Sequence, residues 1–221
     1  MARTIGRIVN HDKNGAFLFA SDIIEEDDGR VHFIADADID ADGANGQNGQ
    51  PAAYRVDVGG TDYLKNAGMA MNGGRVVIAE TWARDNVILD SNNEPKVFPG
   101  NIIASRTWYK DPGLSANDPA AFVDAETVPY VVVPPLIIQE TAGVVRGCRA
   151  RVSWNGKSVD CVVADKGPSR KTGELSVAAA RALGIPSSPK NGGTDHADVL
   201  YELWPGQAAM VNGVRFILQP A

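Results

Sequence analysis

The sequence predicts a mainly β fold. Its 221 residues include 23 glycines and 13 prolines, and its apolar runs are short and often interrupted, a pattern typical of many short strands joined by turns. The length suffices for one full domain with a sizeable core, or for two small ones. Hydrophobic residues make up 44% of the chain and charged residues 22%, as in ordinary soluble globular proteins. One or two short helices are expected.

Four aspartates alternate along an early segment. The apolar runs Phe17–Ala20 and Val31–Ile34 predict the first strands. The second run leads into the alternating set, which is Asp36, Asp38, Asp40 and Asp42. In an extended chain every second side chain lies on the same face, so the four carboxylates are expected to point the same way. Their mutual repulsion destabilises a strand unless a cation offsets it.

A Ca²⁺ loop is one explanation of this segment. Asp38, Asp40, Asp42 and Gly43 fit the first half of an EF-hand loop, but Gly49 stands where the closing bidentate acid would be. The EF-hand reading therefore fails, although a different Ca²⁺ loop stays open.

The middle of the chain offers strands and aromatic side chains. Val76–Ala79 predicts a buried strand, and Tyr130–Val133 predicts another because it is a continuous apolar run bounded by prolines. Trp108 and Tyr109 are candidates for stacking on a sugar ring, and Trp82 is a weaker one. A tryptophan is more often simply part of the core.

A β-hairpin is predicted to turn at Asn155 and Gly156. With a two-residue turn, Ala150 faces Cys161 across the hairpin, whereas Cys148 does not. We therefore expect two buried thiols and no disulfide bond.

The segment from residue 161 to residue 185 organises the chain. Cys161–Ala164 reads as a buried strand that ends at Asp165, because Gly167 and Pro168 prevent its continuation. A polar loop then leads to Glu174.

A short helix is predicted directly after this loop. Ser176 is placed to cap it, Val177–Leu183 is rich in alanine and leucine, and Gly184 supplies a left-handed C-terminal residue. One carboxylate thus leaves a rigid strand and a second precedes a rigid helix.

Two acids on separate rigid elements suit glycosidic bond cleavage. One acid protonates the leaving oxygen, and the other activates water or attacks the sugar. Simpler roles are equally open from the local pattern. An aspartate such as Asp165 before Gly-Pro is typical of a turn. A glutamate such as Glu174 before a helix is typical of an acid that interacts favourably with the helix dipole.

This segment resembles the signature region of chitosanases of glycoside hydrolase family 75. The matching residues are Asp165, Gly167, Pro168, Gly173, Glu174 and Ser176. It also resembles the double-psi β-barrel of rare-lipoprotein-A-type lytic transglycosylases, with Lys166 in place of an arginine and Glu174 in place of a second aspartate. The aspartate segment and the strand near Tyr130 resemble family 75 too, although Ala37 and Ala41 depart from its pattern.

The resemblance implies a single catalytic domain over residues 1–221 with a double-psi β-barrel-like core in its C-terminal half. It implies an endo-acting hydrolase that cleaves β-1,4 linkages in chitosan with inversion, with Glu174 as the general acid and Asp165 as the base. It also implies that the aspartate segment binds glucosamine ammonium groups. The alternatives are a peptidoglycan-cleaving lytic transglycosylase-like enzyme and a non-catalytic glycan-binding module.

Charge agrees with a cationic partner. Residues 1–125 carry 19 acids and 11 bases, and the formal net charge is −6. This balance disfavours nucleic acid and suits a cationic polysaccharide, although acidic proteins are common for solubility alone. The histidines and cysteines show no metal-ligand spacing and no nucleotide motif is present, so we expect no metal and no cofactor.

The expected setting follows from the same resemblance. The longest apolar run is too short to span a bilayer. The family works outside the cell, although no secretory signal is visible at the start of the chain. We expect a monomer.

Overall fold

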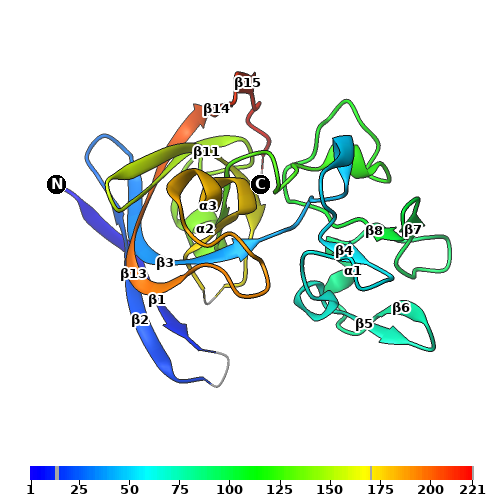
Figure 1. Cartoon of the computed structure of the whole chain (residues 1–221). Coiled ribbons are helices and arrows are strands. Elements are labelled where there is room, and N and C mark those ends of the chain that lie inside the picture. The colour runs from blue at the N-terminus through cyan, green and yellow to red at the C-terminus, as the bar shows by residue number, and fades with distance from the viewer. Residues whose placement is uncertain (13–14, 170, 221) are drawn as a thin grey trace.

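Six strands close into a barrel in the computed structural model, which describes residues 1–12, 15–169 and 171–220. Around the barrel the order is β3, β12, β9, β11, β10 and β13, and β13 pairs back onto β3. Figure 1 labels β3, β11 and β13 of these strands. The bounds of these strands are β3 Val31–Asp40, β9 Tyr130–Val133, β10 Cys148–Trp154, β11 Lys157–Lys166, β12 Glu174–Ser176 and β13 Thr194–Ala208.

The strand order contains two interlocked crossings. β9 is the barrel strand that follows β3 along the chain, but β12 lies between these two strands in the sheet. β9 in turn lies between β12 and β11. β3 with β12 and β9 with β11 are the parallel pairs, and the other barrel pairs are antiparallel. This arrangement confirms the predicted mainly β fold with a double-psi-like barrel. The barrel differs from the prediction in one respect, because β3 comes from the N-terminal half of the chain.

The N-terminal hairpin extends the sheet away from the barrel. β1 (Arg3–His11) pairs with β2 (Phe17–Glu25), and β2 pairs with β3. At the other end of the chain, β14 (Met210–Val211) and β15 (Val214–Arg215) form a small separate hairpin.

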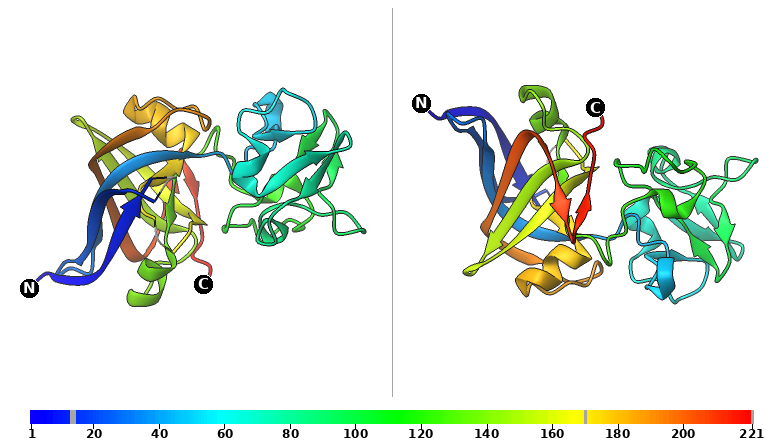
Figure 2. Two further views of the ribbon diagram at one scale, coloured as in Figure 1. Left: turned by 90° about the horizontal axis from the view of Figure 1, so that it is seen from below. Right: turned by 90° about the horizontal axis from the view of Figure 1, so that it is seen from above.

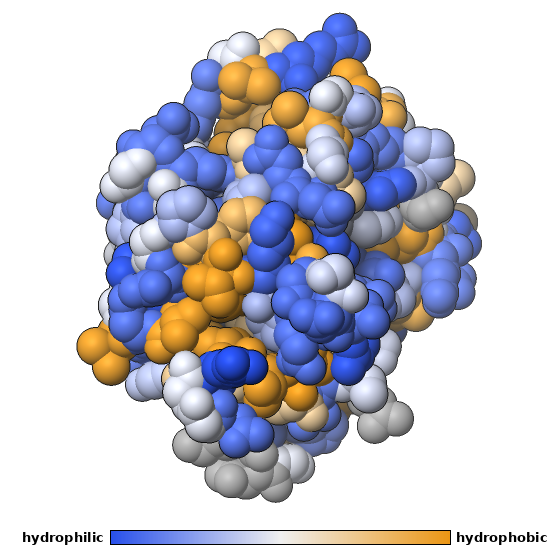
Figure 3. Space-filling view, turned by 90° about the vertical axis from the view of Figure 1, so that its right-hand side faces the viewer, coloured by the Kyte–Doolittle hydropathy of each residue, from blue (hydrophilic) through white to orange (hydrophobic). Residues whose placement is uncertain are grey.

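Everything between β3 and β9 forms an inserted lobe, residues 41–129, which lies beside the barrel in every view (Figures 1 and 2). Its strands are β4 (Tyr54–Arg55), β5 (Met69–Asn72), β6 (Arg75–Ile78), β7 (Val97–Phe98) and β8 (Ile102–Ile103). Its helices are α1 (Ala83–Asn86) and three 3₁₀ turns at Gln47–Gly49, Leu64–Ala67 and Pro119–Ala121. The face of the molecule seen in Figure 3 is mixed, with apolar patches among polar residues. Val58, Met71 and Val97 are exposed large hydrophobic residues of the lobe.

One hydrophobic cluster joins the inserted lobe to the barrel. It contains Tyr54 and Ile103 from the lobe together with Val132, Val162 and Val177 from the barrel. Because this core is continuous, the two parts pack as one domain. A second cluster fills the barrel itself and contains Phe33, Val131 and Leu203.

The predicted hairpin and the predicted helix are both present. β10 and β11 join at Asn155 and Gly156, Ala150 pairs with Cys161, and both cysteines are buried free thiols.

The Ser176 hydroxyl accepts a hydrogen bond from Ala179 N and caps α3 (Val177–Leu183), and Gly184 is left-handed at its end. Two details differ from the prediction. β11 continues one residue beyond Asp165, because Lys166 still pairs with β9. The described residues contain three short α-helices, including α2 (Pro135–Glu140), instead of one or two. None of the helices in the described ranges is long and apolar enough to cross a bilayer.

Candidate active site

A cavity of about 780 Å³ lies where the barrel meets the inserted lobe. The barrel contributes Asp38, Asp40, Val132, Asp165 and Glu174 to its lining. The lobe contributes Asp42, Tyr54, Asp62, Asn66, Trp82 and Asn86. The end of β11 supplies the cation Lys166, and the loops after β11 and α3 supply Lys171 and Lys190. The cavity is therefore strongly acidic with cations around it.

Asp165 is fixed by backbone amides. It lies on β11 next to a bulge, and its Oδ1 accepts hydrogen bonds from Trp108 N at 3.0 Å and Lys166 N at 2.7 Å. Burial raises the pKa of Asp165 well above its usual range, and repulsion from Asp40 adds to the rise. Those amides oppose part of this increase by stabilising the charged form.

Glu174 lies on the opposite side of β9 from Asp165. It pairs with Val132 on one side and with Asp38 on the other, and Asp165 pairs with the same Val132. Directly paired residues share one face of a sheet, and two strand spacings put the two backbone positions roughly 9 Å apart. Burial and repulsion from Asp40 raise the pKa of Glu174 to about 8, with the Lys171 charge partly opposing them.

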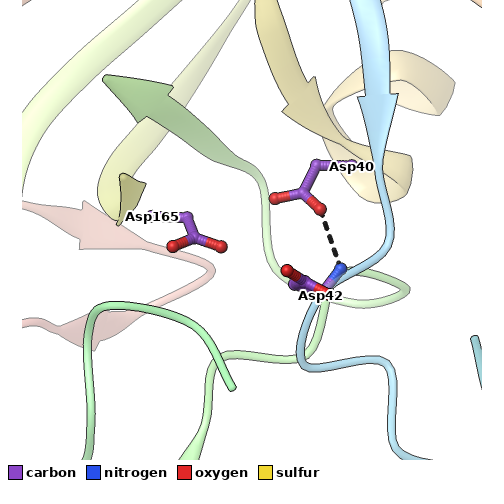
Figure 4. Close-up of side chains that lie close together, drawn as sticks. All are labelled: Asp40, Asp42 and Asp165. Carbon is purple, nitrogen blue, oxygen red and sulfur yellow. Dashed lines mark hydrogen bonds between the residues drawn. The ribbon is translucent and has the colours of Figure 1, made fainter. Parts of the chain in front are cut away.

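Asp40 and Asp42 sit at the end of β3, close to Asp165 (Figure 4). The Asp40 Oδ1 accepts a hydrogen bond from Asp42 N at 2.9 Å, and the buried Tyr130 hydroxyl donates to its Oδ2 at 2.9 Å. The Tyr54 hydroxyl lies 3.3 Å from Asp42 Oδ1 and 3.1 Å from Asp62 Oδ2. Burial raises the pKa values of both Asp40 and Asp42.

Asp40 and Asp165 lie close together, with one carboxylate oxygen of each within 4.8 Å of the other. Repulsion from Asp40 raises the pKa of Asp165, because two buried negative charges this close disfavour the ionised form.

Asp36 and Asp38 continue the acidic face along β3. Asp38 lines the cavity, is half-exposed, and pairs with the Lys171 ammonium at 2.5 Å. Asp36 lies outside the cavity lining and is buried, and its Oδ1 has no hydrogen-bond partner among the described residues. Burial, followed by repulsion from Asp38, raises the pKa of Asp36 to about 7.

The two predicted stacking residues lie outside the lining of this cavity. The Trp108 ring packs under the Arg146 guanidinium at 5.5 Å, and its backbone amide is what reaches the site. Tyr109 is buried edge-on against Phe216 beside a separate cavity of about 480 Å³. The aromatic side chains that do line the main cavity are the buried Tyr54 and Trp82, which is 46% exposed.

The geometry of Asp40, Asp42 and Asp165 is also compatible with a cation. One carboxylate oxygen from each lies within 4.8 Å of the others, and oxygen ligands of this kind are those that hard divalent cations prefer. The cluster alone does not identify a ligand, because buried carboxylates that share a proton lie equally close.

Several lining residues carried no sequence signal. Tyr54, Asp62 and Lys171 belong to loops or to a very short strand, without a motif that distinguishes them. Their roles depend on how the inserted lobe packs against the barrel, which is not visible in local patterns. Trp82 was the weaker of the three aromatic candidates in the sequence, because local patterns do not show which aromatic side chain lies outside the core.

Comparison with known proteins adds no relative. The chain matches no protein-family model, and no curated protein matches its sequence. The resemblance to family 75 chitosanases therefore rests on the residues quoted above.

Proposed function

We propose that this protein is an endo-acting glycoside hydrolase that cleaves β-1,4 linkages in chitosan with inversion at the anomeric carbon. The observation that carries the proposal is the pairing of Asp165 and Glu174 with opposite sides of Val132 inside one acid-lined cavity. Two carboxyl groups that flank a substrate channel are the requirement of this reaction.

Glu174 acts as the general acid. With a pKa of about 8, its carboxyl group is protonated at neutral pH and can donate that proton to the glycosidic oxygen as the C1–O bond breaks. Ordinary glutamate is ionised at this pH, so burial is what suits this residue to the role.

Asp165 acts as the base. Its carboxylate takes a proton from a water molecule as the water oxygen bonds to C1 from the face opposite the leaving group. The hydrogen bonds from Trp108 N and Lys166 N stabilise the charged form of this carboxylate. The roughly 9 Å between the backbone positions supports the wider carboxyl separation of about 6.5–9.5 Å that inversion needs.

The acidic cavity favours a cationic chain. Four carboxyl groups with raised pKa values are energetically costly to ionise together, and ammonium groups of glucosamine stabilise their charged forms. Peptidoglycan and chitin are N-acetylated and supply no such charge. The proposed reaction involves no cofactor, takes place on one copy of the chain, and belongs to an extracellular setting.

The experiment measures reducing-end release from chitosan, chitin and peptidoglycan side by side. Asp165→Asn and Glu174→Gln are each expected to lower kcat on chitosan by at least ~10²-fold, with the fold and chitosan binding retained. Asp160→Asn and Glu140→Gln, which change exposed acids outside the cavity, serve as matched controls. Near-native activity of either site variant would refute its role, and cleavage of peptidoglycan alone would refute the substrate.

A further inference from the structure

Trp82 is the exposed aromatic side chain that the acid–base mechanism leaves unused. It comes from the inserted lobe and lines the same cavity as Asp165 and Glu174, which come from the barrel. Its indole is 46% exposed, although a tryptophan side chain gains more free energy from burial than almost any other. An exposed indole in a cavity wall is therefore suited to bind a ligand.

Among the described residues, no protein cation occupies the ring face of Trp82, and the same holds for Trp154, which lies outside the cavity. Arg146 stacks on Trp108 and Arg149 stacks on Trp204 at 4.3 Å, whereas among the described residues no cation lies over Trp82. The ring is held in place from behind, because a Cβ atom at Gly68 would stand 3.0 Å from the indole Cζ2. The left-handed Gly68 thus permits a close contact that fixes the indole.

A carboxylate from the same lobe accompanies this ring. Asp62 lines the cavity and is 9% exposed. Its Oδ1 accepts hydrogen bonds from Tyr63 N at 2.7 Å and Asn66 Nδ2 at 2.8 Å. Its Oδ2 accepts one from the Tyr54 hydroxyl and keeps further acceptor capacity.

We propose that Trp82 and Asp62 form a glucosamine-binding subsite on the inserted lobe. Every ring substituent of a β-1,4-linked glucosamine unit is equatorial, so both faces of its ring present axial C–H groups that pack flat on an indole. Its ammonium group donates hydrogen bonds that the Asp62 carboxylate accepts. The identity of the ligand rests on the proposed function. With this subsite, the inserted lobe binds and selects the sugar, and the barrel supplies the catalytic carboxyl groups.

The test measures binding in a Glu174→Gln background, so that the ligand is not consumed. Glucosamine hexamer and N-acetylglucosamine hexamer are titrated by calorimetry and by tryptophan fluorescence. Trp82→Ala is expected to weaken binding of both hexamers about tenfold, and Trp82→Phe by no more than about threefold, because a phenyl ring still stacks. Asp62→Asn is expected to weaken binding of the glucosamine hexamer alone.

Controls separate binding from folding. Trp82→Phe should abolish the fluorescence change on binding, whereas Trp154→Phe should keep it. Phe17→Ala removes an exposed aromatic side chain outside the cavity and should bind both hexamers with parental affinity. The Asn side chain at position 62 can still accept the hydrogen bonds from Tyr63 and Asn66, so the melting temperature should be retained.

The outcomes distinguish this subsite from the reaction itself. If wild-type protein cleaves chitosan but Trp82→Ala binds both hexamers with parental affinity, the subsite is refuted and the proposed function stands. If wild-type protein does not cleave chitosan yet hexamer binding depends on Trp82, the proposed function is refuted and the subsite stands. Equal losses for both hexamers in Asp62→Asn would refute the role of Asp62.

Discussion

Glu174 and Asp165 owe their proposed roles to their neighbours. Both are buried acids with raised pKa values, but Lys171 lies near Glu174, whereas Asp165 lies beside Asp40 and accepts two backbone amide hydrogen bonds. Glu174 must hold a proton in the proposed reaction, and Asp165 must be ionised to accept one. The two residues differ in their polar neighbours more than in their burial.

Removing the Lys171 charge should shift the pH dependence in a known direction. In the proposed mechanism, activity requires protonated Glu174 and is expected to be lost as pH rises through its pKa of about 8. Lys171 lowers this pKa, so Lys171→Met is expected to move the alkaline limb of kcat/KM to higher pH. The measurement is a pH–rate profile on chitosan with Lys157→Met, a change outside the cavity, as the control. A limb that stays in place or moves to lower pH would exclude Glu174 as the group that sets it.

Asp36 should make the folded state less stable as pH rises. Its pKa is about 7 in the folded protein and near 3.8 in an unfolded chain, so the folded state binds the proton more tightly. The stability that this proton provides is complete below about pH 4 and is lost as pH rises to about 7. Asp36→Asn is therefore expected to raise the melting temperature at pH 8 by at least ~2 °C and to leave it unchanged at pH 4. Equal shifts at both values, with exposed Asp22→Asn as the control, would contradict this explanation.

At the scale of elements, β3 combines a barrel face and a site face. Phe33, Ala35 and Ala37 pack into the barrel, while Asp36, Asp38 and Asp40 alternate with them along the strand. Asp42, the fourth aspartate of the predicted set, follows the end of β3. The environments of the aspartates along the face differ, because Asp36 is buried, Asp38 is half-exposed and Asp40 is enclosed with Asp165.

Asp38 is the member of the strand expected to attract substrate without taking part in the chemistry. Asp38→Asn should raise KM for chitosan about 2–5-fold with kcat little changed, because one half-exposed ion pair contributes modestly. It should also weaken the salt dependence of KM, since screening acts on the charge that was removed. Initial rates at several salt concentrations, with Asp22→Asn as the control, provide the measurement. An unchanged KM with a lowered melting temperature would show that Asp38 is structural instead.

Local patterns were sufficient for some elements and insufficient for others. The strand before Asp165, the Ser176 cap and the turn at Asn155 depend on neighbouring residues, so they could be predicted. The grouping of Asp40 with Asp165 depends on strands 125 positions apart in sequence that curve around a barrel, and no local signal encodes it. The sequence favoured Trp108 as an aromatic residue of the site, whereas Trp82 lines the cavity. This difference also depends on how distant parts of the chain pack together.

At the scale of the whole molecule, the cavity exists because the inserted lobe closes over one face of the barrel. The barrel positions Asp165 and Glu174 through strand pairing, and the lobe contributes Asp42, Tyr54, Asp62 and Trp82. The continuous hydrophobic cluster between the two parts packs the lobe against the barrel. In the proposed function, the barrel supplies the chemistry and the inserted lobe supplies the recognition of the sugar.

The stereochemistry of the first product tests the central claim most directly. Proton NMR of a glucosamine hexamer, recorded as soon as wild-type protein is added, distinguishes the anomer released before mutarotation. Water activated by Asp165 attacks from the face opposite the leaving group, so we predict that the new reducing end is the α anomer. A β anomer would contradict the base-and-water mechanism and require a nucleophilic carboxylate, and an uncleaved hexamer would contradict the proposed activity itself.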